Sequence, residues 1–267
     1  MINNHLQMEP KTKTIVNVLW TGGMDSSFRM IQLSKFPLLI QPVYIMDNRR
    51  SEKRELSAIT EITRAIEDHP ETCCTILPLL KFDVTKIPPD KEITDAFQRL
   101  HKVIPIGSQY DWLARFAKLY PGIEISFEKC EINQTYICMH TKGSYQKVTE
   151  GYISYAMLEK TNSDPDLYTV FGNFHFPLPL FEITKIEEFN RYKTLGFEHI
   201  INKTWFCHKP INDEPCGVCK PCQSVVQEGL TFRLPTSAIK RYETEIKYRQ
   251  FWWFFFYKKI RRYINGY

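Results

Sequence analysis

Short apolar runs alternate with longer stretches of helical periodicity through the first half of the chain. Residues 14–20 (TIVNVLW) and 38–46 (LLIQPVYIM) are rich in β-branched and aliphatic side chains, which predicts two buried strands. Residues 26–36 and 52–68 place apolar side chains on one helical face. A third strand is predicted over residues 74–80. Strands that alternate with helices are typical of βαβ units, so the pattern predicts an α/β fold built on a parallel sheet.

The later pattern is less regular, and residues 130–167 show no clear period. The remaining predicted elements are a helix that aligns Ile93, Phe97 and Leu100, a helix over 110–120, a strand over 168–176 and a helix over 181–196. The last of these carries Thr184 and Glu187 at capping-box spacing and ends at Gly196. A length of 267 residues fits one large domain, or one domain with an appendage.

Composition narrows the class of protein. A hydrophobic content of 43% with 24% charged residues is typical of a globular protein, and no apolar run approaches the roughly 18 residues that cross a bilayer. The N-terminal residues contain no apolar segment behind a basic start, so we expect no secretory signal and a cytoplasmic location. Reduced cysteines are the rule there, so closely spaced cysteines indicate a metal or catalytic site.

Residues 20–27 (WTGGMDSS) join the first predicted strand to the following helix. Gly22 and Gly23 permit positive φ and close backbone approach, and a helix N-terminus supplies unsatisfied N–H groups that suit phosphate. The loop is neither a Walker A motif nor a G-x-G-x-x-G fingerprint. The alternative is an ordinary tight turn in which Asp25 is the helix N-cap.

Four cysteines lie close together near the C-terminus in the pattern C-x8-C-x2-C-x2-C, namely Cys207, Cys216, Cys219 and Cys222. Four thiolates match a closed tetrahedral zinc site, which predicts a structural metal, although an iron–sulfur cluster has the same ligands. His208 could replace one ligand. The other cysteines, Cys73, Cys74, Cys130 and Cys138, lack ligand spacing and are interpreted as small core residues.

The loop resembles the SGGxDS signature of the PP-loop ATP pyrophosphatases, with Thr21 in place of the first serine. Together with the cysteine pattern, it resembles the 7-cyano-7-deazaguanine synthases, which are zinc-containing PP-loop enzymes. The segment TWFCHKP, the segment PLFEITKIEEFNRYKTLG and the segment RRSEKREL also resemble parts of that family, and the resemblance spans about residues 14–230.

The resemblance implies a Rossmann-like domain of the adenine nucleotide alpha hydrolase type over residues 1–200 and a zinc-binding subregion over 201–230. Residues 231–267 form an extra basic, aromatic tail beyond the resemblance. The resemblance implies ATP binding by Trp20, Thr21, Gly22, Gly23, Met24, Asp25, Ser26 and Ser27. Asp25, Ser26 and Lys185 would be catalytic, with Asp25 holding Mg²⁺. Possible substrate or phosphate contacts are Arg49, Arg50 and Glu55.

The implied reaction is that of a carbon–nitrogen ligase. ATP adenylates 7-carboxy-7-deazaguanine, an amine donor displaces AMP, and the final product is 7-cyano-7-deazaguanine. The family's Tyr-Gly pair is absent, and IGSQYDWLARFAK stands where the family has a Pro-x-Arg-Asn segment. An alternative is therefore a relative that stops at an amide or conjugates the deazaguanine to another amine, such as one on a protein. A non-catalytic PP-loop binding module is a further alternative.

The C-terminal tail concentrates charge and aromatic rings. From Ile239 to Tyr267 the sequence has eight Lys or Arg and two Glu. The net charge of this segment is therefore larger than the net charge of +5 of the whole chain. Packing on the body, on a partner protein or in a homodimer would bury the rings. Single-stranded nucleic acid and a membrane surface are the alternatives. His175 follows a predicted strand and is interpreted as a core histidine, with ligand contact as the alternative.

Overall fold

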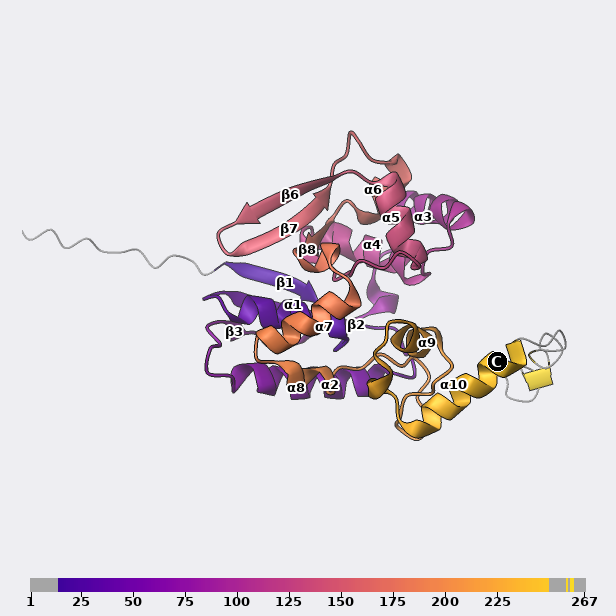
Figure 1. Ribbon diagram of the computed structural model, residues 1–267. Helices are drawn as coiled ribbons and strands as arrows, with labels where there is room; N and C mark the ends of the chain where they lie inside the picture. The colour runs from indigo at the N-terminus through magenta and orange to yellow at the C-terminus, as the bar shows by residue number, and fades with distance from the viewer. Residues whose placement is uncertain (1–13, 250–257, 259, 262–267) are drawn as a thin grey trace, which may run out of the picture.

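The computed structural model describes residues 14–249, 258, 260 and 261. Within these residues eight strands form one sheet in the order β3-β2-β1-β5-β8-β7-β6, and β4 pairs with β2 beyond the end of β3 (Figure 1). The strands are β1 (Ile15–Leu19), β2 (Leu39–Met46), β3 (Thr75–Ile76), β4 (Leu80–Asp83), β5 (Ile123–Glu124), β6 (Tyr145–Glu150), β7 (Ile153–Leu158) and β8 (Phe174–Pro177). The predicted α/β fold is confirmed.

The sheet is parallel from β3 to β8 and antiparallel at the β6 edge. β6 and β7 form a hairpin around Gly151, whose φ is +59°, so the connection needs no crossover helix. β5 lies on the opposite side of β1 from β2, so the strand order reverses beside β1. Ligands of open α/β sheets bind outside the carboxyl ends of the strands at such a reversal. The glycine loop follows β1 directly.

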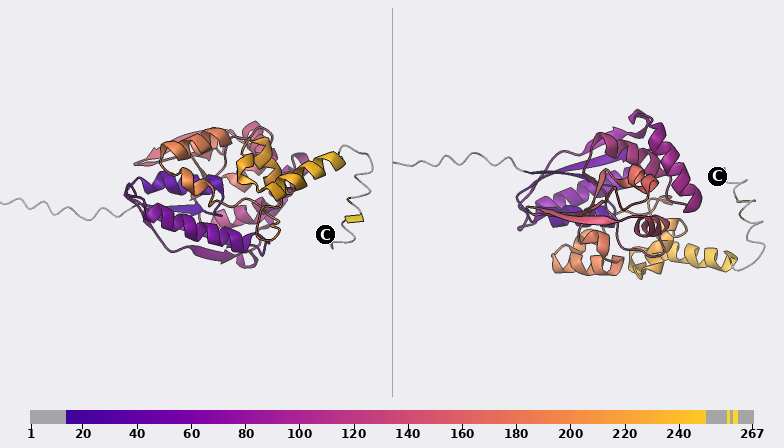
Figure 2. Two further views of the ribbon diagram at one scale, coloured as in Figure 1. Left: turned by 60° about the horizontal axis from the view of Figure 1, so that its bottom comes forward. Right: turned by 90° about the horizontal axis from the view of Figure 1, so that it is seen from above.

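Helices cover both faces of the sheet, and each face has its own hydrophobic cluster in the described residues (Figure 2). One face carries α1 (Met24–Ser34), α2 (Glu52–Glu67), α7 (Lys185–Thr194) and α8 (Glu198–Ile201). The other carries α3 (Lys91–Val103), α4 (Gln109–Leu119), α5 (Gln134–Lys142) and α6 (Pro165–Phe171). Side chains alternate accordingly, since Val18 and Trp20 belong to the first cluster and Leu19 to the second.

Capping residues at the helix N-termini explain where several of these helices begin. The predicted capping box of α7 is present, with Glu187 N–H donating to the Thr184 hydroxyl and the Glu187 carboxylate accepting from the Thr184 N–H. The strand predicted over 168–176 was wrong in its first half. Asp164 accepts hydrogen bonds from the N–H groups of Asp166 and Leu167 and starts α6, whose first residue is Pro165.

The strand predicted over residues 74–80 is split. β3 ends at Ile76, and β4 begins at Leu80. Pro78 lies between them, and it has no N–H to donate to a ladder. Both short strands still pair in parallel with β2, as expected for the predicted parallel sheet.

The C-terminal part packs below the sheet and then projects from the body. It contains α9 (Lys220–Gln227) and α10 (Thr236–Arg249) (Figures 1 and 2). Among the described residues, short 3-10 turns lie at Val84–Lys86, Leu180–Glu182 and Thr231–Arg233. The aromatic run at residues 251–257, on which the predictions for the tail rest, lies outside the described residues. In the described part of the chain, no helix has the length and apolar character needed to cross a membrane.

A buried ion pair joins α1 to β5 beneath the glycine loop. The guanidinium of Arg29 donates to both carboxylate oxygens of Glu124, with N–O distances of 2.7 and 2.5 Å, and the two side chains are 4% and 2% exposed. A bidentate geometry offsets much of the desolvation cost of the two charges. The pair therefore fixes the position of α1 relative to the centre of the sheet.

We expect removal of one partner to be far more damaging than removal of both. Arg29→Met leaves the Glu124 carboxylate buried without its cation and should lower the free energy of unfolding by about 3–5 kcal/mol. The double variant Arg29→Met/Glu124→Leu should recover most of this loss. Urea denaturation of the three proteins measures it, and a double variant as unstable as the single one would contradict the expectation.

Candidate active site at the glycine loop

The glycine loop makes a sharp turn between β1 and α1. Gly22 has a φ of +69°, and a Cβ atom there would lie 2.9 Å from the carbonyl oxygen of Glu55 and 3.0 Å from the Cβ of Ala58. Only glycine fits this position without displacing α2. Gly23, with extended backbone, is the N-cap of α1, so Asp25 is not the N-cap and lies in the first helical turn.

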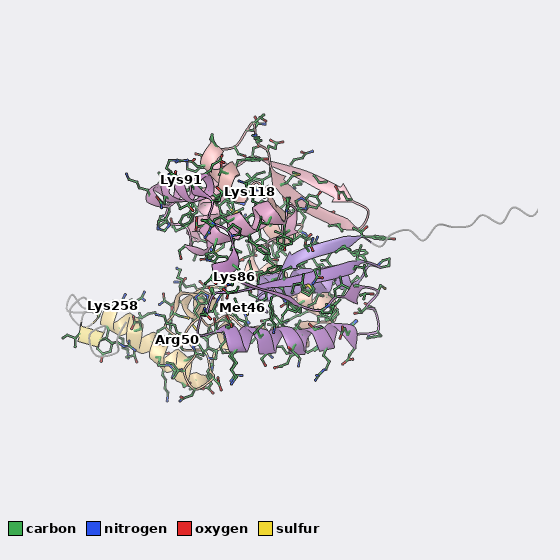
Figure 3. The ribbon with its side chains drawn as sticks, turned by 180° about the vertical axis from the view of Figure 1, so that it is seen from behind. Met46, Arg50, Lys86, Lys91, Lys118 and Lys258 are labelled. Carbon is green, nitrogen blue, oxygen red and sulfur yellow. The ribbon has the colours of Figure 1, made fainter. Side chains whose placement is uncertain are left out.

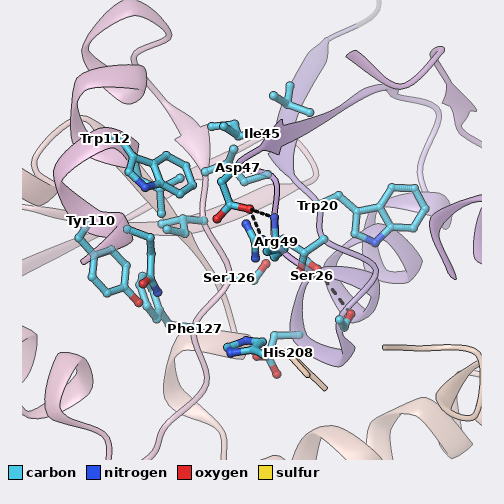
Figure 4. Close-up of a pocket in the computed structure, with 18 residues that line it drawn as sticks. Trp20, Ser26, Ile45, Asp47, Arg49, Tyr110, Trp112, Ser126, Phe127 and His208 are labelled. Carbon is cyan, nitrogen blue, oxygen red and sulfur yellow. Dashed lines mark hydrogen bonds and ion pairs between the residues drawn. The ribbon is translucent and has the colours of Figure 1, made fainter. Parts of the chain in front are cut away.

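The N-terminus of α1 has no side-chain cap among the described residues. Residues of its first turn line a cavity of about 400 Å³ at the carboxyl ends of the central strands (Figure 4). Thr21, Gly23, Asp25 and Ser26 line this first cavity, so a polar ligand there would meet hydroxyls and backbone donors together. The arrangement has the features of an anion site.

The opposite side of the first cavity is aromatic. The rings of Tyr110, Trp112 and Phe127 line it across from Ser26, and the ion pair of Asp47 with Arg49 lies between the two sides (Figure 4). The Arg49 Nε to Asp47 Oδ1 distance is 2.6 Å. A flat, polar heterocycle could stack on such rings and form hydrogen bonds at its edge.

The eight loop residues predicted to bind ATP lie in different environments in the structure. The Trp20 indole donates to the hydroxyl of the buried Ser27 at 3.0 Å, so these two side chains face the core and each other. Met24 lines a neighbouring second cavity, and the backbone of Gly22 faces the segment before the cysteines. Trp20 also lines the first cavity, together with Thr21, Gly23, Asp25 and Ser26, beside the strand end.

The second cavity has a volume of about 590 Å³ and adjoins the first along the loop. Both cavities are lined by the residues Thr21, Gly23, Asp25, Arg49, Gln109, Tyr110 and His208. Lys185, the first residue of α7, forms an ion pair with Asp25 across 160 residues of sequence. The structure therefore brings the predicted Asp25, which lines both cavities, together with Lys185, which lines the second.

Carboxylates that the sequence analysis did not single out surround Lys185. Its ammonium lies 3.6 Å from Glu128 and 3.1 Å from the fully buried Glu188. Burial, followed by the charge of Glu188, raises the pKa of Glu128 to about 8, and burial also raises the pKa of Glu228. Glu188 is partly compensated because the positive charge of Lys185 opposes the effect of burial on its pKa. Perturbed carboxyl groups in a cavity are typical of functional sites.

The three predicted substrate contacts do not behave alike. Arg49 lines both cavities, whereas Glu55 is buried and accepts hydrogen bonds from the hydroxyls of Ser51 at 2.6 Å and Tyr44 at 2.8 Å. Glu55 also lies 3.7 Å from Arg49 and lines the second cavity. Arg50 is exposed just before α2 and lines neither cavity (Figure 3).

The four cysteines of the C-terminal pattern converge. Sγ–Sγ distances include 3.4 Å between Cys219 and Cys222, 3.8 Å between Cys207 and Cys219, and 3.9 Å between Cys216 and Cys222. A tetrahedral ZnS₄ site needs sulfurs about 3.8 Å apart. The backbone N–H groups of Cys216, Val218 and Cys219 donate to cysteine sulfurs, which stabilises thiolates. The cluster could therefore hold zinc.

Helix α10 closes this cysteine loop. A Cβ on Gly217, whose φ is +81°, would lie 2.0 Å from the carbonyl oxygen of Ala238. The guanidinium of Arg241 donates to the carbonyl oxygens of Cys216 and Pro215 at 2.8 and 3.1 Å. The first turns of α10 are thus part of the packing around the cysteines, although the sequence analysis placed residues 231–267 in a separate tail.

The segment before the first cysteine holds the glycine loop. The N–H of Trp205 donates to the carbonyl oxygen of Gly22 at 2.8 Å, and its indole donates to the carbonyl oxygen of Cys207, also at 2.8 Å. His208 lines both cavities, so it faces the candidate site. The group of possible metal ligands formed by the four cysteines does not include it. His175, in contrast, stacks on Tyr155 with ring centres 3.7 Å apart and lines neither cavity.

Comparison with known proteins supports part of this picture. Residues 144–231 match the family model described as "Queuosine biosynthesis protein QueC". The matched segment includes Lys185 and the four cysteines, whereas the glycine loop lies before it. No curated protein matches the chain. The family match thus agrees with the resemblance found in the sequence and covers the part of the chain that holds the cysteine site and one wall of the second cavity.

We expect removal of the metal from the cysteine site to loosen the glycine loop. Chelation, or Cys216→Ser, should speed amide hydrogen exchange in residues 27–30, the first hydrogen-bonded N–H groups of α1, at least tenfold, because the bond from Trp205 to Gly22 that holds the preceding turn depends on the order of the cysteine segment. Mass spectrometry of deuterated peptides measures this. Cys73→Ser is the matched control, because it changes an exposed cysteine outside the cluster. Faster exchange confined to residues 205–222 would show that the two segments are independent.

Proposed function

We propose that this chain is an ATP-dependent ligase that adenylates 7-carboxy-7-deazaguanine and replaces AMP by an amine, giving 7-cyano-7-deazaguanine after a second activation. The observation that carries the proposal is the contact of Asp25, in the glycine loop that lines both cavities, with Lys185 at the second cavity. The match of residues 144–231 to the QueC family supports the substrate class.

In this proposal the β and γ phosphates of ATP lie at the N-terminus of α1. Its uncapped N–H groups and the hydroxyls of Thr21 and Ser26 bind phosphate oxygens, and the helix dipole favours their negative charge. The adenosine extends into the first cavity, where the Trp112 and Tyr110 rings offer stacking surfaces. The α-phosphorus then lies at the edge of the second cavity.

The carboxylate substrate occupies the second cavity. One of its oxygens attacks the α-phosphorus, the bond to the bridging oxygen breaks, and pyrophosphate leaves. Lys185 stabilises the negative charge that develops on the phosphate oxygens, so catalysis is mostly positioning and charge neutralisation. The carboxylate of Asp25 fits a Mg²⁺ ion, which would supply further neutralisation of the phosphates when bound. Arg49, at the wall shared by the cavities, is placed to bind either substrate.

Zinc at the four cysteines has a structural role in this proposal. Four sulfur ligands leave no open coordination position, and the site adjoins the loop through Trp205. Zinc binding would therefore order the segment that supports Gly22. This assignment distinguishes the cysteine site from the reacting centre.

The experiment that tests the proposal is product analysis with ATP, Mg²⁺, 7-carboxy-7-deazaguanine and ammonia. AMP, pyrophosphate and the nitrile are expected. AMP with an amide alone would favour a relative that stops earlier, and a protein adduct by intact mass would favour conjugation to another amine. No AMP from the zinc-loaded protein would contradict adenylation and favour a binding module.

Lys185→Gln should lower the rate of ATP–pyrophosphate exchange by about 10²–10³-fold, which is typical of losing one preorganised charge at a reacting phosphate. Lys193→Gln is the matched control, since Lys193 lies on the same helix and its side chain is 46% exposed. We expect this control to react at the rate of the unmodified protein. Equal rates for Lys185→Gln and Lys193→Gln would remove Lys185 from the mechanism.

A further inference from the structure

The second cavity ends in a group of carboxylates with too few cations. Glu128 and Glu228 line it together with Cys130 and Lys185, and Glu188 adjoins them through Lys185. With Asp25 included, four carboxylates face three cations, Lys185, Lys220 and Arg233, so one negative charge is in excess. Buried like charges require a bound cation or a proton for each excess charge. This end of the cavity is therefore suited to a cationic ligand.

A second, independent observation concerns Glu188. Its side chain is fully buried, and its Oε1 atom has no hydrogen-bond partner among the described residues, while its Oε2 accepts from Lys185. An unpaired carboxylate oxygen in a buried site is costly. The unmet hydrogen-bonding capacity thus lies in the same group of side chains as the excess negative charge.

The spacing of the groups suits an ammonium ion. The carboxylate oxygens of Glu128 and Glu228 and the sulfur of Cys130 lie within 4.8 Å of one another. An ammonium that donates two charged hydrogen bonds of about 2.8 Å at the tetrahedral angle needs acceptor oxygens about 4.6 Å apart. The Glu128 side chain is 15% exposed, so such an ion would be largely removed from water.

We infer that the acidic end of the second cavity binds the amine donor as ammonium between Glu128 and Glu228, and that Glu128 accepts its proton. This inference rests on the proposed function. Transfer of one proton to the Glu128 carboxylate leaves neutral ammonia, whose lone pair attacks the carbonyl carbon of the acyl adenylate. The bond to AMP then breaks, AMP leaves with the electron pair, and the new amide nitrogen releases its extra proton to water.

Acid–base properties agree with this role. A carboxyl with a pKa of about 8 is close in proton affinity to ammonium, which makes it an effective proton acceptor near neutral pH. The groups that face Glu128 from the packed elements are Lys185 and Glu188 on α7, Glu228 after α9, Tyr110 on α4 and Cys130 on its own loop. Deprotonation of Glu128 should therefore govern the ammonium-dependent step, which rises with pH towards about 8.

A divalent metal fits the same three ligands less well. Burial raises the pKa of both Glu128 and Cys130, so a metal would have to displace two protons. Lys185 is also 3.6 Å from the Glu128 carboxylate and would repel a doubly charged ion more than a singly charged one. Ammonium carries one charge and brings its own proton donors.

The test separates activation from amine capture. With 7-carboxy-7-deazaguanine, ATP–pyrophosphate exchange reports adenylation, ammonium chloride supplies the cationic nucleophile, and hydroxylamine supplies one that is neutral at pH 7.5. Glu128→Gln should raise the KM for ammonium chloride at least tenfold at pH 7.5, with exchange and hydroxamate formation within about threefold of the unmodified protein. At pH 9, where free ammonia is abundant, the difference in KM should narrow to about threefold.

Glu131→Gln is the matched control, because Glu131 is on the same loop but 76% exposed and paired with Lys129. It should leave the KM for ammonium unchanged. Folding is checked by urea denaturation. A raised carboxyl pKa means that stability falls as pH rises from 4.5 towards about 8, and Glu128→Gln removes that loss. The variant should therefore be at least as stable as the unmodified protein at pH 8.5.

Several outcomes would overturn the inference. Equal losses with ammonium and hydroxylamine would make Glu128 a structural residue, and an unchanged KM would exclude it from amine binding. A second equivalent of Zn²⁺ that disappears in Glu128→Gln would make the group a metal site. Saturable broadening of the ¹⁵N-ammonium NMR signal, lost in Glu128→Gln, tests binding without ATP. No exchange in the unmodified protein, with that broadening present, would contradict the proposed function alone.

Discussion

The ion pair between Asp25 and Lys185 joins the first helix of the chain to the seventh, and the candidate site depends on it. Both residues start helices, so their positions are set by the turn at Gly22 and by the capping box at Thr184. In the chain without ligands, the pair keeps two charges compensated at the edge of two cavities. A phosphate ligand and its metal ion could replace each partner by another charge of the same sign, so binding need not leave either group unpaired.

A metal bound by the four cysteines would add a further limit to the movement of the same loop. Gly22 is packed against α2 on one side and hydrogen-bonded to Trp205 on the other. Because Trp205 precedes Cys207 by two residues, a metal bound at the cysteines would restrict the segment that supports the loop. The loop has few internal contacts of its own, so its order depends on these external contacts.

The sequence allows prediction of those parts of the site whose chemistry is local. The glycine loop and the cysteine pattern are short motifs, and the resemblance located Lys185 through its surrounding segment. Glu128 and Glu228 could not be found in this way, because they become neighbours only when the loop after β5 meets the end of α9. The β6–β7 hairpin also escaped prediction, since residues 145–150 are mostly exposed and alternate poorly.

The predictions of secondary structure failed where an apolar run suits both a strand and a helix. Tyr168–Phe171 is such a run, and Asp164 before Pro165 is the signal that starts a helix there.

The buried carboxylates of the candidate site lower the stability of the folded chain. The chain tolerates Glu128 and Glu188 because hydrophobic clusters on both faces of the sheet and the Arg29–Glu124 pair supply stability elsewhere. Such a cost at the wall of a cavity is expected where the charges have a ligand to bind.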